Sequence, residues 1–341
     1  MSKILSGLLL VFAIFFSLPG QASMEQTLEI SFQDDRLEQA IKDILQKDDN
    51  EAVTQRDMKS LSVVNLKGKG ITRLAGLEYA SNITELDLSQ NEIKDIGPLR
   101  ELTKLTKLNL SENQIKDLNP LKKMTKLSEL DLKSNLVYDL APLKSLEFLN
   151  VLYLDNNRVW NLEPIRNLTF NHYYDTGGFV TFLQLSNNYL DLRDPPPSKT
   201  LKILNELDGE ASRQSQLKFQ RLVIGSTTAY VWESPFKLTH APFIASGRTY
   251  VPIRFVSKWL GSEVSWYQSK KEVTIRKGSR TIHWTVNEKK ANVNGETVSV
   301  DAPLLLKNNS TFVPVRFVSD VLESSVEYMA NPKTVLIFEK K

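Results

Sequence analysis

An asparagine recurs at a constant interval through the first half of the chain, and each copy stands in the same apolar frame. The frame reads Leu-x-Leu-x-x-Asn-x-(Ile/Val), with further leucines or isoleucines after it. The regularly spaced asparagines are Asn91, Asn113, Asn135 and Asn157. One such turn cannot bury its own leucines, so the turns must stack on one another.

This pattern predicts a leucine-rich repeat solenoid over residues 59–194. The Leu-x-Leu alternation is typical of a short strand, so the residues that flank and separate the leucines should face the open concave side. Acidic positions on that face lead toward aromatic ones, which are enriched at protein interfaces. We predict that a protein partner binds there through Glu85, Asp87, Asn109, Glu129, Asp131, Tyr153, Phe182 and Gln184. The alternative is an ordinary solvated sheet face.

The repeated asparagines are predicted to point inward. A short amide side chain can satisfy backbone groups that a sharp turn would bury without partners, so stacked asparagines should form a structural ladder. Asn188 continues the ladder after a longer interval from Asn157, which indicates an insertion near residues 171–178. Lys69 stands where the first asparagine is expected, as is common in a terminal turn.

The segment Ile30-Ser31-Phe32-Gln33-Asp34, the helical stripe of Leu37, Ile41 and Leu45, and the runs Gly76–Ala80 and Leu86–Ser89 carry a family resemblance. Together they resemble the N-terminal cap and first turns of internalin-type leucine-rich repeat proteins of Gram-positive bacteria. The resemblance implies a helical cap over residues 24–58 and a right-handed α/β horseshoe that recognises proteins. It does not specify the partner.

The second half of the chain repeats with a different period. After a predicted linker and short helix over residues 195–218, Thr249–Ser257 aligns with Thr311–Ser319 at an offset of 62. The strand-like alternation around each copy predicts one smaller α+β domain made of two similar halves over residues 219–341. This region resembles the copper amine oxidase N-terminal-like domain through Gly247–Val256, Leu260–Trp266 and Ala291–Gly295. The resemblance implies an accessory module of secreted or envelope proteins.

Copper chemistry is not expected from this domain. The chain has three histidines, His172, His240 and His283, scattered over two domains, and an amine oxidase would need a histidine cluster. We therefore predict no metal ligands and no cofactor. Arg254 and Arg316 occupy equivalent places, and for both we expect a structural role, paired to a carboxylate or to backbone carbonyls near the short helix, with ligand binding as the alternative.

Residues 1–22 read as a secretory signal peptide, with Lys3 before an apolar stretch and small residues at its end. An uncleaved anchor is the competing interpretation. The chain has no cysteine, which rules out disulfides and a lipid-modified cysteine, and no second apolar span or sorting motif follows. We therefore expect a secreted protein without a transmembrane anchor after signal cleavage.

The two halves carry opposite charge. Residues 24–194 hold 27 acidic and 21 basic residues, whereas residues 195–341 hold 13 acidic and 21 basic residues. A basic secreted module could adhere to an anionic cell-wall polymer. The alternative is a solvated surface with a mild excess of charge.

No catalytic motif is present, so we predict no catalytic residues, no enzyme activity and no nucleic-acid partner. The leading hypothesis is a secreted or cell-envelope binding protein. Its repeats would recognise a protein, and its basic C-terminal module would associate with the wall or surface. The alternatives are an architectural envelope protein without an external ligand and, least favoured, metal-dependent amine oxidation.

Overall fold

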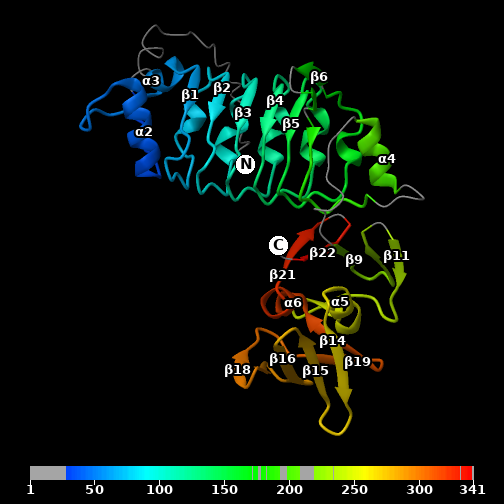
Figure 1. Cartoon of the computed structure of the whole chain (residues 1–341). Helices are drawn as coiled ribbons and strands as arrows, with labels where there is room; N and C mark the ends of the chain where they lie inside the picture. The colour runs from blue at the N-terminus through cyan, green and yellow to red at the C-terminus, as the bar shows by residue number, and fades with distance from the viewer. Residues whose placement is uncertain are drawn as a thin grey trace, which may run out of the picture.

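The computed structural model describes residues 28–170, 172–175, 178–181, 183–192, 198–207, 219–232, 234–330 and 332–339. The predicted signal peptide and the predicted binding residue Phe182 lie outside these described residues. Within them, a solenoid with a parallel sheet precedes a domain of antiparallel sheets, as Figure 1 shows.

Two helices, α2 (Asp35–Leu45) and α3 (Gln55–Ser60), cover the N-terminal end of the solenoid. Asp34 caps α2 by accepting the backbone N–H groups of Arg36 and Leu37. Its other carboxylate oxygen accepts the Thr72 backbone N–H at 2.7 Å and the Arg73 N–H at 3.1 Å. Burial would raise the pKa of Asp34, but these hydrogen bonds outweigh it and lower the pKa. One side chain thus joins the cap to the first turn.

Short parallel strands follow in register at successive turns and form one sheet. Its order in the described chain is β1 (Val63–Asn65), β2 (Glu85–Asp87), β3 (Lys107–Asn109), β4 (Glu129–Asp131), β5 (Val151–Tyr153) and β8 (Leu183–Gln184). The middle residue of each three-residue strand is buried, and its neighbours are more accessible. The predicted alternation is therefore present, with the leucines inside.

The chain returns from each strand through short 3-10 helices. They are η1 (Leu77–Tyr79), η2 (Gly97–Glu101), η3 (Asn119–Lys123), η4 (Ala141–Ser145) and η5 (Glu163–Ile165). From η2 onward a proline occupies the first turn, where its fixed φ suits a helix and its missing N–H costs no hydrogen bond. An aspartate two residues ahead accepts the first N–H of η2, η3 and η4.

The repeated asparagines are buried and bond across adjacent turns. In Asn135, Oδ1 accepts the Ile115 N–H at 2.9 Å, and Nδ2 donates to the carbonyls of Leu110 and Leu132 at 2.9 and 3.1 Å. The same contacts recur one turn apart at Asn91, Asn113, Asn157 and Asn188. Each amide therefore closes its own turn and ties it to the turn before.

The residue before each ladder asparagine has a left-handed backbone although none is glycine. These residues are Gln90, Glu112, Ser134, Asn156 and Asn187, with φ between 55° and 58°. A non-glycine residue there costs about 1 kcal/mol. The hydrogen bonds of the following asparagine hold the turn in this conformation.

The predicted insertion forms an antiparallel hairpin of β6 (His172–Asp175) and β7 (Gly178–Thr181). The hairpin precedes β8, so it lies at the edge where the chain enters the strands. Figure 1 shows β6 at the edge opposite the C-terminal domain. The short helix predicted within residues 195–218 is α4 (Lys199–Glu206).

The described part of the C-terminal domain holds three antiparallel sheets. One contains β9 (Phe219–Val223), β10 (Thr228–Val231), β11 (Ser234–Lys237), β21 (Ser324–Met329) and β22 (Thr334–Glu339). The second contains β12 (Phe243–Ala245), β13 (Arg248–Pro252), β19 (Leu305–Lys307) and β20 (Ser310–Pro314). The third contains β14 (Glu263–Tyr267), β15 (Glu272–Lys277), β16 (Arg280–Thr285), β17 (Lys290–Val293) and β18 (Glu296–Ser299).

Two short helices, α5 (Ile253–Trp259) and α6 (Val315–Val321), each follow a central strand of the second sheet. Their buried apolar residues join the sheet side chains in one core that includes Trp284, 1% exposed. Two cations close the C-terminal end of α6, because Lys277 donates to the Leu322 carbonyl and Arg280 to the Val321 carbonyl.

The two domains pack together through an aromatic cluster. Phe219 and Phe338, both fully buried, lie against Tyr189 and Trp160 of the repeats, with ring centroids of Trp160 and Phe219 5.3 Å apart. At its rim the Glu327 carboxylate accepts hydrogen bonds at 2.7 Å from both Lys116 and Arg158.

The repeat contacts in this interface come from one edge of the solenoid. Lys94, Lys116, Tyr138 and Trp160 occupy one column, three residues after successive ladder asparagines. The column changes from lysine to aromatic residues as it approaches the C-terminal domain. The domain therefore docks on the edge where the chain leaves the strands, and the strand face is not part of the contact.

Asn135→Ala should lower the free energy of unfolding by about 2–4 kcal/mol, because it leaves several buried backbone groups without partners. Asn135→Asp should be similarly destabilising, since a carboxylate keeps the shape but loses both donors. Urea unfolding followed by circular dichroism measures both. The matched control is Asn119→Ala, because the next turn carries Ala141 at the same position. A loss of under about 1 kcal/mol in Asn135→Ala would contradict the structural role of the ladder.

Trp160→Ala should uncouple the domains, because it removes an aromatic contact between them at a cost of about 2 kcal/mol or more. Calorimetry should show the melting transitions of the solenoid and the C-terminal domain further apart than in the parent chain. Phe148→Ala, at a side chain 69% exposed, should leave the thermogram unchanged. An unchanged thermogram for Trp160→Ala would show that the cluster does not couple the domains.

Candidate functional site

The accessible side of the parallel sheet, called the strand face here, carries two parallel rows of side chains. The strand register aligns Val63, Glu85, Lys107, Glu129 and Val151 in the first row. It aligns Asn65, Asp87, Asn109, Asp131, Tyr153 and Gln184 in the second. Of the predicted partner-binding residues, all but Phe182 are thus brought together on one surface.

Second-row residues also have a structural task that the sequence did not reveal. The Oδ1 atoms of Asp87, Asn109 and Asp131 each accept the backbone N–H two residues later, at 2.8, 3.0 and 2.9 Å. Asn65 does the same for Lys67. These side chains hold the end of their strand, so one of their oxygens is already engaged. The first-row glutamates have no such backbone bond in the described chain.

Cations are interspersed among the acids. Lys107 lies 3.7 Å from the Glu85 carboxylate, and Lys133 lies 4.0 Å from Asp155. The Lys133 ammonium also sits 4.3 Å from the centre of the Tyr153 ring. The acidic character of the face is therefore strongest on β2 and β4, and it is partly balanced toward β5.

Asp131 is the perturbed acid of the face. Burial raises its pKa, and the neighbouring carboxylates of Asp155 and Glu129 add to the rise. The hydrogen bond and charge of Lys133 oppose it without cancelling it. An approaching cation stabilises the charged form of a carboxylate that lies in an acidic, partly desolvated row.

The strand face is shallow. The hollow over β1 to β4 has a volume of about 250 Å³ and is lined by Asn65, Glu85, Asp87, Lys107 and Glu129 with their neighbours. Pockets for small molecules usually enclose about 300–1,000 Å³. An open polar surface of this kind suits a protein surface better than an enclosed ligand.

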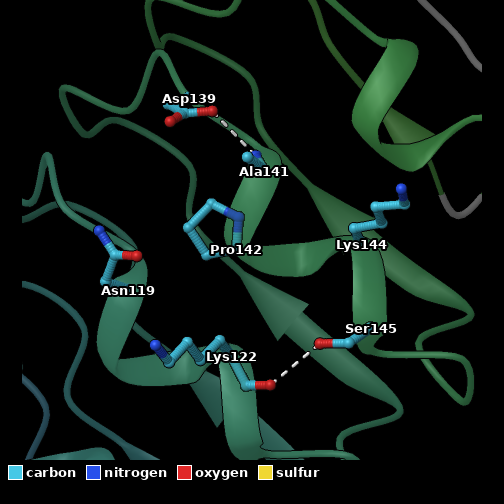
Figure 2. Close-up of a pocket in the computed structure, with 7 residues that line it drawn as sticks. All are labelled: Asn119, Lys122, Asp139, Ala141, Pro142, Lys144 and Ser145. Carbon is cyan, nitrogen blue, oxygen red and sulfur yellow. Dashed lines mark hydrogen bonds between the residues drawn. The ribbon is translucent and has the colours of Figure 1, made fainter. Parts of the chain in front are cut away.

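A second hollow of about 460 Å³ lies on the side of the 3-10 helices, between η3 and η4. Figure 2 shows that its polar groups already serve the turns: Asp139 accepts the Ala141 N–H, and Ser145 donates to the Lys122 carbonyl. This hollow is a gap between adjacent returns, and its lining shows no convergent set of reactive groups.

The donor set does not fit copper. His240 bonds Ser310 at 2.8 Å, and His283 lies 3.0 Å from Thr274 and 3.1 Å from Glu272. Among the described residues, no group of three or more His, Cys, Asp or Glu side chains could hold a metal ion. We also find, in the part of the chain that the structure describes, no helix of the length and apolarity needed to cross a bilayer.

Family models match both halves of the chain. The leucine-rich repeat model, which holds two copies, matches residues 81–123, and the copper amine oxidase N-terminal domain model matches residues 222–337. The chain joins leucine-rich repeats to a copper amine oxidase N-terminal domain. The leucine-rich repeats and the copper amine oxidase N-terminal-like domain that the sequence motifs indicated are thereby confirmed.

Solved structures similar to this chain include two internalins of Listeria monocytogenes. The first (inlF) is 28% identical with a TM-score of 0.42, over 53% of this chain and 56% of its own length. The second (internalin C2) is 25% identical with a TM-score of 0.31, over 50% of this chain and 93% of its own length. The CBM51-2 and INT domains of Clostridium perfringens ZmpB are 37% identical with a TM-score of 0.24, over 26% of this chain and 19% of that one. A search of curated proteins gave no match.

Asp131→Asn should raise the melting temperature at neutral pH. The raised pKa means that the native state binds this proton more tightly than the unfolded chain, so stability falls as pH rises through that window. Asparagine removes this loss and can still accept the Lys133 N–H, as Asn109 does for Ser111. The advantage should vanish near pH 3, where the carboxyl is protonated in both states.

The reverse change, Asn109→Asp, is the matched control. It adds a carboxylate between Asp87 and Asp131 and should lower the melting temperature at neutral pH. Thermal melts of both variants at neutral pH and near pH 3 measure these changes in melting temperature. If Asp131→Asn were less stable than the parent chain at neutral pH, the desolvated-acid description of this row would be wrong.

Proposed function

We propose that the chain is an exported binding protein whose strand face recognises a protein partner and whose basic C-terminal domain associates with the cell envelope. The observation that carries the proposal is the placement of the two domains. The C-terminal domain packs on Trp160 and Tyr189 at the solenoid edge, and the rows of the strand face stay accessible. A surface that its own chain leaves uncovered is available to a partner.

The chemistry of the face favours a partner with a basic patch and an apolar contact. Glu85 and Glu129 flank Lys107 in the first row, and Asp87 and Asp131 lie beside them in the second. Tyr153 lies at the far end of the second row, next to Gln184. Charge complementarity would steer the partner, and the aromatic ring would supply an anchor. We include in this proposal the right-handed horseshoe curvature, with this face on its concave side.

Association with an anionic wall polymer is supported by charge. Residues 195–341 hold 21 basic and 13 acidic residues, and Lys270, Lys271, Arg276 and Lys290 are exposed at one sheet of the C-terminal domain. Summed electrostatic attraction of this kind weakens with salt. We infer export from the signal-like sequence of residues 1–22. An exported chain would be able to meet a cell-wall polymer.

We also propose that the C-terminal domain consists of two similar halves, related by the offset that aligns Thr249–Ser257 with Thr311–Ser319. The Leu238 N–H donates to Thr227, and at that offset the Val300 N–H donates to Lys289. The Gly225 N–H donates to Pro242, and equivalently the Asn287 N–H donates to Leu304. Strands β13 and β20 pair with each other at the centre of their sheet. These matched bonds support a common ancestry of the halves.

The double variant Glu85→Lys with Glu129→Lys tests the strand-face proposal. It reverses charge in the first row and spares the strand-capping aspartates. The control, Glu101→Lys with Glu147→Lys, makes the same charge change at exposed residues outside the strand rows. Immobilised full-length chains are incubated with surface-protein extracts, and the captured proteins are compared by mass spectrometry.

We expect a captured protein that is lost with the strand-face variant and retained by the control. Loss in both variants, or in neither, would contradict recognition through this face. If no foreign protein is captured and the strand-face variant instead changes self-association in sedimentation analysis, the architectural alternative would replace the proposal.

A further inference from the structure

A hollow of about 660 Å³ lies in the C-terminal domain between α5, β14 and the β19–β20 hairpin. This volume is in the usual range for small-molecule pockets. Figure 1 shows α5, β14 and β19 in the lower half of the molecule, away from the solenoid. We call this hollow the basic pocket.

Charges and rings converge in the basic pocket. Arg254 and Lys258 project from α5 one helical turn apart, and both are exposed, as is Lys237. Phe255 and Trp266 supply aromatic lining, and the Trp266 indole N–H donates to Gln268 at 2.7 Å. Among the described residues, its lining contains no aspartate or glutamate. In the same part of the chain, no ion pair joins Arg254, Lys258 or Lys237 to a carboxylate, and no hydrogen bond joins Arg254 to a carbonyl, which corrects the expectation that Arg254 would be paired.

The other half of the domain has a counterpart hollow of about 480 Å³. Its lining includes Arg316, Val326 and Tyr328, which are the counterparts of Arg254, Val264 and Trp266 in the alignment of the halves. The two hollows are therefore equivalent places in the two proposed halves.

In the counterpart hollow a carboxylate lies close to the arginines, whereas the described residues place none beside the arginine and lysines of the basic pocket. Asp301 lies 2.7 Å from Arg248 and 3.8 Å from Arg316. Its equivalent in the first half is Thr239, which lines the basic pocket and has no charge. Similarly, Asp320 is replaced by Lys258. Compared with its counterpart, the basic pocket therefore carries more positive charge, and the described residues place no equivalent of Asp301 or Asp320 beside it.

We propose that the basic pocket binds an anionic sugar, a hexose ring that bears a phosphate or a carboxylate. The guanidinium of Arg254 and the ammonium of Lys258 would hold the anionic group, because both donate charge-assisted hydrogen bonds. The ring of the sugar would lie against Trp266 and Phe255, whose apolar surfaces are partly exposed in the pocket. This inference deepens the proposed envelope association and rests on it for its biological setting.

Calorimetric titration of the full-length chain with four probes tests the pocket: glucose 6-phosphate, glucuronate, glucose and inorganic phosphate. We expect at least one charged sugar to bind about tenfold more tightly than both glucose and inorganic phosphate. The preference between glucose 6-phosphate and glucuronate identifies the anionic group. Trp266→Ala should weaken the binding of the charged sugar more than the binding of inorganic phosphate.

Arg254→Ala should weaken the binding of the charged sugar about tenfold or more. Its matched control is Arg316→Ala at the equivalent position. Both side chains are exposed, so neither change should disturb folding. Equal losses in the two variants, no binding of either charged sugar, or binding of inorganic phosphate as tight as that of the sugars would overturn the proposal.

Sedimentation of the same variants with purified cell walls separates the two proposals. If the parent chain sediments and charged sugars do not bind, the pocket assignment is wrong and envelope association stands. If charged sugars bind through Arg254 but the chain stays in solution, envelope association is wrong and the pocket assignment stands.

Discussion

The hydrogen bonds of the buried asparagines are the constraint on which the solenoid depends. A strand of three residues followed by a sharp turn leaves backbone groups inside the protein, and unpaired groups there cost about 1–3 kcal/mol each. The asparagine amide satisfies an N–H of the preceding turn and carbonyls of two turns. Because these bonds repeat from turn to turn, the leucines stack in register and the strand rows stay aligned. The accessible strand face is a consequence of that register.

The ladder also explains how the first turn can lack its asparagine. Lys69 has no preceding turn to bond, and the cap takes that place. The Asp34 carboxylate accepts N–H groups from both α2 and the first turn. Along one edge of the solenoid, Tyr189 and Trp160 pack on the aromatic residues of the C-terminal domain, which covers part of that edge. Each of these boundaries of the solenoid is therefore closed by side chains specific to it.

Periodicity made the repeats predictable, since the fixed spacing of the asparagines and leucines determines which side chains stack. It also predicted the accessible rows, because alternation in a strand assigns neighbouring residues to opposite faces. Contacts between distant segments were not predictable in this way. The docking of Phe338 on Tyr189 and the pairing of Glu327 with Arg158 depend on how two domains meet. Arg254 has no carboxylate partner among the described residues, whereas Arg316, 62 residues later, lies 3.8 Å from Asp301. The offset that aligns Arg254 with Arg316 also aligns Thr239 with Asp301, but only the structure shows that Asp301 is the residue near Arg316.

The acidic strand face and the basic C-terminal domain remain separate surfaces because the junction uses the turn edge. That arrangement leaves both surfaces accessible for the partners that we propose, and it requires the turns to keep their register. Hydrogen–deuterium exchange of the full-length chain followed at single residues tests the register most directly. The amides bonded to ladder asparagines, at Ile71, Ile93, Ile115, Val137 and Val159, should be among the slowest to exchange in the solenoid. Exchange at these amides as fast as at exposed turn residues would contradict the account.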